Sequence, residues 1–153
     1  MGHIHKIIDF VVEGFIVYNN SVLLVDHKKA KKILPVGGHI ELDEDPEEAL
    51  FREIEEESGL KKADLTMLSS KPFFNEKGIK SLFSPHYLNI HNISKEHKHI
   101  CFVYFLKSNT NKVILAEKEH NFIKWYSEDD LNKTELLLNI RYYAKAAIHK
   151  ARE

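Results

Sequence analysis

The sequence predicts an α/β domain in which helices are layered against β-strands, and the order of its segments is the main reason. Two runs rich in β-branched and aromatic residues come first, and a helix with clear start and stop signals follows at 46–58. Further β-like runs come next, and a helix with one apolar stripe closes the sequence. This order is typical of an α+β or a layered α/β/α architecture.

The first two predicted strands are residues 10–18 and 22–26, separated by Asn19, Asn20 and Ser21. Asparagine tolerates a positive φ, so this short connection predicts a tight β-hairpin. The next stretch, ILPVGGHIEL, is interrupted by a proline and two glycines. It is therefore predicted to be a loop with exposed backbone.

The helix at 46–58 has signals at both ends. Asp45 is a good N-cap, Pro46 suits the first helical position, and Glu48 stands three residues after the cap, as in a capping box. Gly59 follows Ser58 and can adopt the left-handed conformation that ends many helices. Both boundaries are thus predicted by local chemistry.

The second half of the sequence predicts several strands and one long helix. The β-like runs are residues 65–74, 82–90, 100–106, 113–115 and 122–126. The closing helix is predicted at about 134–150 because apolar residues recur at helical intervals, namely Leu136, Leu137, Ile140, Tyr143, Ala144, Ala147 and Ile148. Such a stripe is typical of a face that packs on a core.

Bulk properties limit the possible classes of function. The 153 residues fit a single domain spanning 1–153, and that length is enough to bury a substantial core. The net charge of -1 provides no general attraction for nucleic acid or an anionic membrane. Cys101 is the single cysteine, which excludes an internal disulfide and is compatible with a reducing compartment. No membrane span or export signal is recognisable, so a cytoplasmic location is predicted.

Carboxylates are concentrated on one side of the predicted helix. Leu50, Phe51 and Ile54 fall on one face at 100° per residue, while an adjoining arc carries three glutamates, Glu53, Glu56 and Glu57. Like charges at this spacing repel one another, and Arg52 alone cannot neutralise them. A divalent cation such as Mg²⁺ or Mn²⁺ is the economical compensation. The alternative from composition alone is a solvated, glutamate-rich surface helix.

The spacing of these residues resembles the Nudix box, G-x5-E-x7-R-E-U-x-E-E-x-G-U, in which U is aliphatic. The sequence from Gly38 to Leu60 meets all nine specified positions without a gap. The hairpin before this segment and the stretch EHNFIKWYSEDDL after it are also arranged as in Nudix hydrolases. The resemblance implies the Nudix α/β/α sandwich, with a mixed β-sheet between helices.

Carried over to these positions, the resemblance implies roles for individual residues. Glu56 and Glu57 correspond to carboxylates that bind the activating metal ions, and Gly37 corresponds to a backbone carbonyl ligand. Glu53 corresponds to a glutamate that binds metal or acts as general base, with Arg52 beside it fixing the rotamers of the glutamates. Glu44 matches a supporting glutamate. Outside the box, Glu119 is the best match for a further metal-binding carboxylate, and Glu117 is the second.

The activity that the resemblance implies is metal-dependent hydrolysis of a nucleoside diphosphate linked to another group. Water activated by metal and Glu53 would attack one phosphorus of a small nucleotide substrate. Features of ADP-ribose and dinucleoside-polyphosphate hydrolases are not recognisable after the box, so a MutT-like nucleoside triphosphate pyrophosphohydrolase is the leading prediction, with an oxidised deoxynucleotide as one candidate substrate. Hydrolysis of ADP-ribose, nucleotide sugars or dinucleoside polyphosphates, a non-catalytic nucleotide-binding module and a prenyl diphosphate isomerase are the alternatives. A monomer or a homodimer is compatible with this reading.

A histidine-rich segment, SPHYLNIHNISKEHKHICFVYF, is the other unusual stretch. His97 and His99 would share one face of a strand if the strand begins that early. Three interpretations remain open: contacts with the substrate by His86, Tyr87, His97 and His99, a distinct metal site, or loop and strand-edge residues without such a role.

Overall fold

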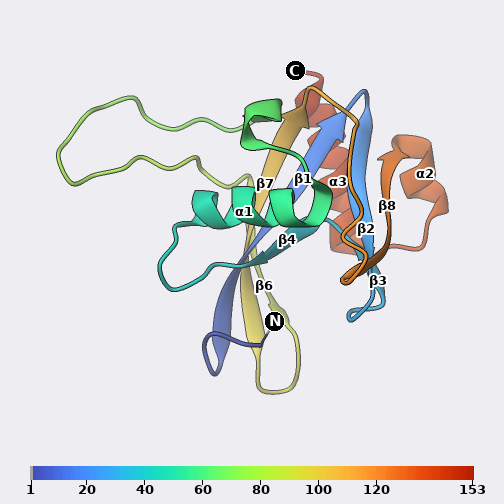
Figure 1. Ribbon diagram of the computed structural model, residues 1–153, viewed down its shortest axis with the longest axis horizontal. Coiled ribbons are helices and arrows are strands. Elements are labelled where there is room, and N and C mark those ends of the chain that lie inside the picture. The colour runs from blue at the N-terminus through green and yellow to red at the C-terminus, as the bar shows by residue number, and fades with distance from the viewer. Residues whose placement is uncertain (1) are drawn as a thin grey trace.

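The computed structural model describes residues 2–153, and within them eight strands form one mixed β-sheet (Figure 1). The strands are β1 (Ile8–Tyr18), β2 (Ser21–His27), β3 (Lys32–Leu34), β4 (Val36–His39), β5 (Leu65–Met67), β6 (Tyr87–Asn92), β7 (Lys98–Ser108) and β8 (His120–Ser127). The helices are α1 (Pro46–Ser58), α2 (Glu128–Lys133) and α3 (Leu138–Ala151), and a single 3₁₀ turn covers Lys62–Asp64.

Strand β1 is the centre of the sheet. It pairs in parallel with β7 from Ile8↔Lys98 to Val17↔Lys107, and antiparallel with β2 and β4. Strands β3 and β8 extend the sheet beyond β2, while β5 and β6 pair with β7. The parallel β1–β7 pair therefore brings the start of the chain beside residues about ninety positions later.

The sheet is covered by a helix on each face, and each interface has its own core. Alternate residues of β1 point to opposite faces, so Val12 and Ile16 pack with α1 whereas Phe15 and Val17 pack with α3. On the α1 side the fully buried helix residues include Leu50 and Ile54. This confirms the predicted α/β/α layering around a mixed sheet.

The local signals for the first hairpin and for α1 are confirmed. Asn19 and Asn20 both have positive φ, as the tight turn requires. Asp45 accepts hydrogen bonds from Glu47 N and Glu48 N, the Glu48 side chain closes the capping box, and Gly59 ends the helix at φ 74°. The predicted bounds of α1 agree with the structure.

Other boundaries differ from the prediction for tertiary reasons. Four of the ten residues of the predicted loop at 33–42 form strand β4, because β1 supplies hydrogen-bond partners for its backbone. Residues 113–115 are not a strand, because Ile114 N donates to Ser58 O and holds this segment at the end of α1. The closing helix begins at Leu138 rather than 134, since Arg141 binds the carbonyls of Leu131 and Thr134 and fixes the preceding turn.

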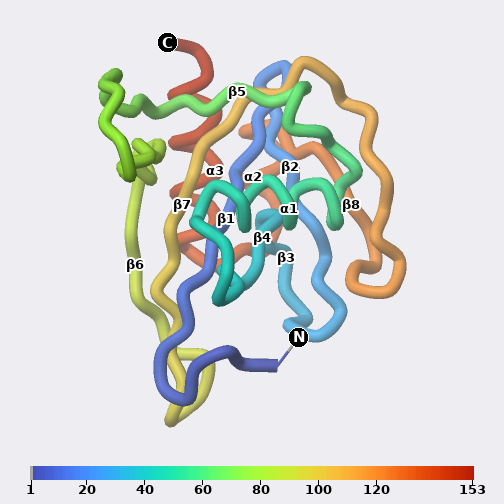
Figure 2. The backbone as a smooth tube through the Cα atoms, turned by 60° about the vertical axis from the view of Figure 1, so that its left-hand side comes forward, coloured from blue at the N-terminus to red at the C-terminus, as the bar shows by residue number. Residues whose placement is uncertain are grey.

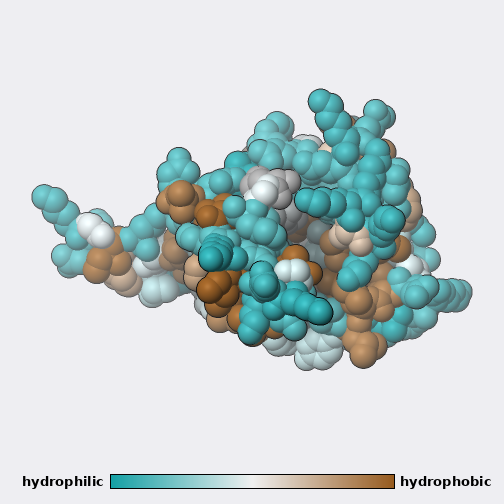
Figure 3. Space-filling view, turned by 90° about the horizontal axis from the view of Figure 1, so that it is seen from below, coloured by the Kyte–Doolittle hydropathy of each residue, from teal (hydrophilic) through white to brown (hydrophobic). Residues whose placement is uncertain are grey.

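Strands β5 and β6 are shorter than the predicted runs 65–74 and 82–90, because residues 68–86 form a projecting arm (Figure 1). The arm exposes apolar side chains, and Phe73 is fully exposed. Seen from below, it extends from one side of a face on which hydrophilic residues surround smaller hydrophobic areas (Figure 3). Among the described residues, none of the helices has the length and apolar character needed to cross a bilayer.

Candidate functional site

The spacing of residues in the box produces a close contact between β4 and α1. Gly38 faces Glu53, and a Cβ atom at position 38 would lie 2.3 Å from Glu53 Oε1. Only a glycine at this position leaves the Glu53 carboxylate where it is. The glycine thus has a steric role that the loop prediction did not show.

Arg52 organises the surrounding carboxylates. Its Nε and Nη2 atoms bind both oxygens of Glu44 at 3.0 and 2.5 Å, and its Nη1 donates to Glu53 Oε1 at 2.8 Å. Nη1 also reaches Glu56 at 3.3 Å, and Nη2 donates to the carbonyl of His39 at 3.0 Å. These charge-assisted bonds raise the pKa of Arg52 and lower that of Glu44, so both stay ionised.

Glu57 is the most buried of the three predicted metal-binding glutamates. It is 3% exposed, and its Oε1 accepts a hydrogen bond of 2.7 Å from Gly37 N. Its Oε2 lies 2.7 Å from Nε2 of buried His120, although this contact lacks the alignment of a hydrogen bond. Glu57 is therefore held between β4 and the start of β8.

Glu53 has the protonation behaviour of a base that works near neutral pH. Burial raises its pKa to about 7, and the negative charges of Glu57 and Glu56 add to this rise while Arg52 opposes it. A carboxylate with such a pKa accepts a proton more readily than an ordinary glutamate does. The arrangement places a basic carboxylate directly beside other carboxylates on one helix face.

A cavity of about 570 Å³ lies against this face. Its lining includes Gly37, Glu53 and Glu57 together with a group of basic residues, namely His27, Lys28, Lys29 and Lys118. Lys28 also binds the carbonyl of Glu117 through its side chain and that of Glu119 through its backbone, and so fixes the loop before β8. A cavity lined by both carboxylates and lysines suits an anionic ligand with a bound cation.

The structure brings most, but not all, of the predicted site residues together. Glu119 is exposed and lies at the cavity, and ligand atoms of Glu57, Glu119 and His120 all lie within 4.8 Å of one another. Glu56 points outward with a side chain that is 57% exposed, next to Arg52.

The histidine-rich segment is divided between two places. His86 stacks on Phe105, and Tyr87 packs against Tyr143 of α3, so neither lines the cavity beside Glu53. His99 does line that cavity, and His97 is buried behind it.

Sequence reasoning missed four residues near this cavity: His3, Asp9, His39 and His120. His39 directly follows the Gly37-Gly38 pair, and this position in the sequence could have indicated that it lies near the cavity. His3 and Asp9 reach the site only through the β1–β7 pairing, and His120 only through the β2–β8 pairing.

The donor set fits a divalent metal ion. Glu57, Glu119 and His120 each offer a ligand atom within 4.8 Å of the others, and the two ring nitrogens of buried His120 have no hydrogen-bond partner in residues 2–153. Carboxylate oxygens are the ligands that Mg²⁺ and Mn²⁺ prefer. Arg52 supplies the hydrogen bonds that orient such ligands.

Comparisons with known proteins agree with this geometry. The family model described as NUDIX domain matches residues 11–146. A crystal structure of a NUDIX-family hydrolase from Clostridium perfringens is 36% identical, with a TM-score of 0.78, over 92% of this chain and 96% of that one. A search of curated proteins found no significant match.

More distant structures share the fold. A MutT NUDIX hydrolase from Burkholderia pseudomallei is 21% identical with a TM-score of 0.65, covering 94% of this chain and 97% of that one. An Ap4A hydrolase from C. elegans is 21% identical with a TM-score of 0.53, covering 95% of each chain. The match to the family model spans most of the chain and includes the whole box, so this protein belongs to the Nudix family and is a Nudix hydrolase.

Proposed function

We propose that this enzyme cleaves the diphosphate linkage of a nucleoside triphosphate in a Mg²⁺-dependent reaction, as a MutT-like pyrophosphohydrolase. The observation that carries the proposal is a single cavity lined both by buried Glu53 and Glu57 and by lysines. A triphosphate with its cation suits both kinds of lining residue, since the lysines attract phosphate oxygens and the carboxylates hold the cation.

The metal ligands in this proposal are Glu53, Glu56, Glu57 and Glu119, together with the Gly37 carbonyl. When bound, the metal supplies charge neutralisation to the diphosphate and acidifies a water molecule. Glu53 removes the proton from the attacking water, for which its pKa of about 7 is suited. Arg52 keeps the Glu53 carboxylate in place through the 2.8 Å bond.

The lysines that line the cavity favour a substrate with several phosphates. Lys28 and Lys29 stand between β2 and β3, and Lys118 stands just before β8, so positive charge reaches the cavity from two loops. A nucleoside triphosphate presents enough negative charge to contact both loops. Dinucleoside polyphosphates, nucleotide sugars and ADP-ribose share the diphosphate and are the competing substrates.

The test is a hydrolysis assay of the full chain with Mg²⁺ over nucleoside triphosphates, oxidised nucleotides and the competing substrates, with release of phosphate or pyrophosphate as the readout. Glu53→Gln and Glu57→Gln are expected to lose about 100-fold or more in kcat. Glu55→Gln is the matched control, because Glu55 is on the same helix but exposed and paired with Lys61. Full activity in the Glu53 and Glu57 variants, or no hydrolysis of any triphosphate, contradicts the proposal.

A further inference from the structure

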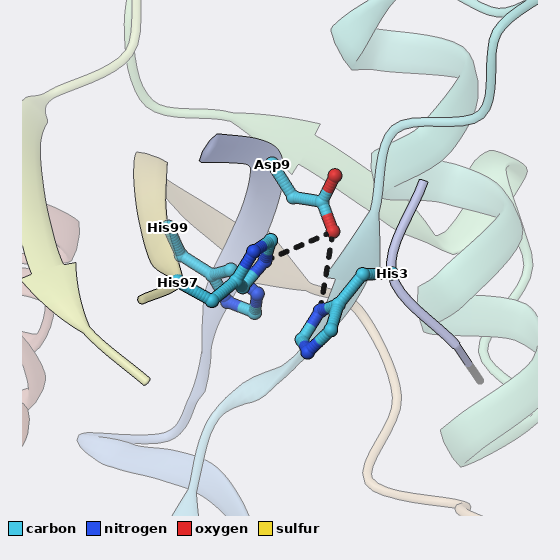
Figure 4. Close-up of side chains that lie close together, drawn as sticks. All are labelled: His3, Asp9, His97 and His99. Carbon is cyan, nitrogen blue, oxygen red and sulfur yellow. Dashed lines mark ion pairs between the residues drawn. The ribbon is translucent and has the colours of Figure 1, made fainter. Parts of the chain in front are cut away.

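A second polar cluster lies beside the cavity, on the other side of β4. It consists of His3, Asp9, His97 and His99, and Figure 4 shows ion pairs from His3 and His97 to one Asp9 oxygen, with His99 beside them. One ligand atom from each of the four lies within 4.8 Å of the others. These residues come from the N-terminal segment, β1, and the start of β7 with the turn before it, segments that meet in Figure 2.

The β1–β7 register explains why the cluster forms. Asp9 pairs with His99 across the parallel strands, and alternate residues share a face, so both side chains project to the same side. His97 Nδ1 binds the carbonyl of Lys6 at 3.1 Å, which ties the N-terminal segment to the turn before β7. The backbone N–H groups of Ile4 and His5 donate to Asp9, so the segment that carries His3 folds back over the carboxylate.

The hydrogen bond of His97 fixes its tautomer. A backbone carbonyl only accepts, so Nδ1 of His97 carries the proton, and in a neutral ring Nε2 is left with a lone pair. The Nε2 atom lies 3.2 Å from Asp9 Oδ2, which is also a hydrogen-bond acceptor. Two acceptors facing each other in a buried site repel unless a cation lies between them or the ring is protonated.

The other imidazoles add to the same imbalance. His3 Nδ1 and His39 Nε2 lie 3.4 and 3.1 Å from the same Asp9 oxygen, which is fully buried. Nε2 of His39, His97 and His99 are all buried without a hydrogen-bond partner in the part of the chain that the structure describes. One carboxylate balances one positive charge, so the cluster cannot be satisfied by protonating all of its rings.

Imidazole nitrogens that stay neutral are available as metal ligands. The rings of His97 and His99 lie with centroids 5.3 Å apart, and the buried Nε2 of His99 has no hydrogen-bond partner among residues 2–153. The rings of His3 and His97 lie with centroids 3.6 Å apart, a separation at which two positively charged rings would repel strongly. Three rings around one carboxylate offer three nitrogen ligands and one oxygen ligand.

We propose that His3, Asp9, His97 and His99 form a binding site for a transition-metal cation of the zinc type, distinct from the Mg²⁺ site on α1. Nitrogen-rich donor sets of this kind favour zinc and its neighbours over Mg²⁺. Ligand atoms around a tetrahedral zinc lie roughly 3.3 Å apart, so the observed cluster needs only a small contraction. His39 Nε2 lies 3.1 Å from the same Asp9 oxygen, so this ring is a neighbour that can orient the carboxylate.

The proposed metal would fasten the N-terminal segment against the sheet. His3 and His99 both line the cavity that contains Glu53, so the metal also fixes one wall of that cavity. The proposal does not depend on hydrolytic activity, because it concerns a different donor set.

Zinc binding to the full chain tests the proposal directly. Chelator-treated protein is dialysed against Zn²⁺ with millimolar Mg²⁺ present, and bound zinc is measured by mass spectrometry; the expected result is one zinc per chain. Co²⁺ in place of Zn²⁺ is expected to give visible absorption bands typical of tetrahedral nitrogen and oxygen ligation.

Three variants locate the bound ion. His97→Ala and His3→Ala are each expected to weaken zinc binding at least about tenfold. His3 is half-exposed, so its variant keeps the fold even where loss of buried His97 does not, which far-UV circular dichroism without zinc checks. His5→Ala is the matched control, because His5 is an exposed imidazole in the same segment that packs on Phe10 instead.

Four outcomes overturn the proposal. The first is that zinc does not bind to the wild-type protein in the presence of Mg²⁺, and the second is that His3→Ala and His97→Ala bind zinc as tightly as the wild type does. It is also overturned when Glu57→Gln loses the zinc while His3→Ala retains it, since the ion then belongs to the α1 site. A loss in His5→Ala equal to that in His3→Ala indicates binding by the peptide segment alone, and contradicts it as well.

Discussion

The two polar clusters on either side of β4 differ in their ligand chemistry. On the α1 side, Glu53 and Glu57 present carboxylate oxygens to the cavity, and the Arg52 guanidinium donates a hydrogen bond to Glu53. On the other side, imidazole nitrogens surround the single carboxylate of Asp9, and no lysine or arginine of the described chain pairs with it. Oxygen ligands select hard cations and nitrogen ligands select zinc-type cations, so adjoining walls of one cavity can hold different ions.

One short strand separates these clusters. Gly38 faces Glu53 whereas the next residue, His39, turns its ring toward Asp9, as expected for alternating side chains in a strand. The His39 carbonyl also accepts a hydrogen bond from Arg52. A change in β4 can therefore affect one cluster and spare the other, depending on which residue is replaced.

The largest expected effect comes from Gly38→Ala. The new Cβ would lie 2.3 Å from Glu53 Oε1, so the carboxylate must move, and hydrolysis should fall about 100-fold or more. The clash is with the end of a side chain, so the free energy of unfolding should change by less than about 1 kcal/mol. Measured kcat/KM and thermal unfolding check both statements, and zinc binding should persist.

Gly37→Ala provides the contrasting control. Its Cβ would lie 2.1 Å from the backbone oxygen of Val12, which cannot rotate away. Unfolding should then become easier by about 2 kcal/mol or more, as overpacking predicts. Equal effects of the two substitutions on stability would contradict the division of roles within β4.

Removing and restoring metals should separate the two clusters. After chelation, Mg²⁺ is expected to restore hydrolysis, whereas Zn²⁺ at 100 times its dissociation constant should add about 2.7 kcal/mol to stability. Hydrolysis and thermal unfolding are measured for each addition. Restoration of both properties by Mg²⁺ alone would mean that only the carboxylate cluster binds an ion.

The carboxylate cluster was largely predictable because its determinants are local. The cap of α1, the helical spacing of Glu53, Glu56 and Glu57, and the neighbouring Arg52 all lie within one short segment. The pattern predicted the face that carries these carboxylates, but not that Gly38 leaves room for one of them.

The histidine cluster could not be assembled in the same way. Its shape depends on the parallel register of β1 with β7, which joins Asp9 to His99 across about ninety residues. A single sequence carries periodicity within each strand but not the pairing between strands. The grouping of His86 and Tyr87 with His97 and His99 was based on sequence proximity, whereas the structure places the first pair by Phe105 and α3.

Arg52→Lys should have a smaller effect, limited to the carboxylate cluster. Lysine keeps the charge but cannot bind Glu44 through two nitrogens while also reaching Glu53 and the His39 carbonyl. We expect kcat to fall about tenfold, equivalent to about 1.4 kcal/mol, with zinc binding unchanged. Arg152→Lys, at a half-exposed arginine near the C-terminus, is the matched control. An unchanged kcat in Arg52→Lys would show that charge alone is sufficient.

The smallest expected effect concerns Glu13, a carboxylate that belongs to neither of the two proposed metal sites. It lies on β1 opposite Gly37, and its Oε2 is buried without a partner among residues 2–153. Burial raises its pKa to about 7, although a hydrogen bond from Cys101 works in the opposite direction. In the two clusters, neighbouring positive groups or hydrogen bonds favour the ionised carboxylate. Glu13 has fewer such partners, and burial therefore favours its protonated form.

The sign of the pH effect follows from that raised pKa. The folded protein holds the Glu13 proton more tightly than the unfolded chain, whose value is near 4.5, so this stability is complete below that pH. It is lost as the pH rises through about 7. Glu13→Gln removes the loss, and the variant should gain about 1 kcal/mol over the wild type at pH 8 and little at pH 4.5. Chemical denaturation of both proteins across this range measures the difference, with Glu55→Gln as the exposed control. A difference that does not change with pH would mean that folding does not shift the Glu13 pKa, and would contradict the effect of burial on this carboxylate.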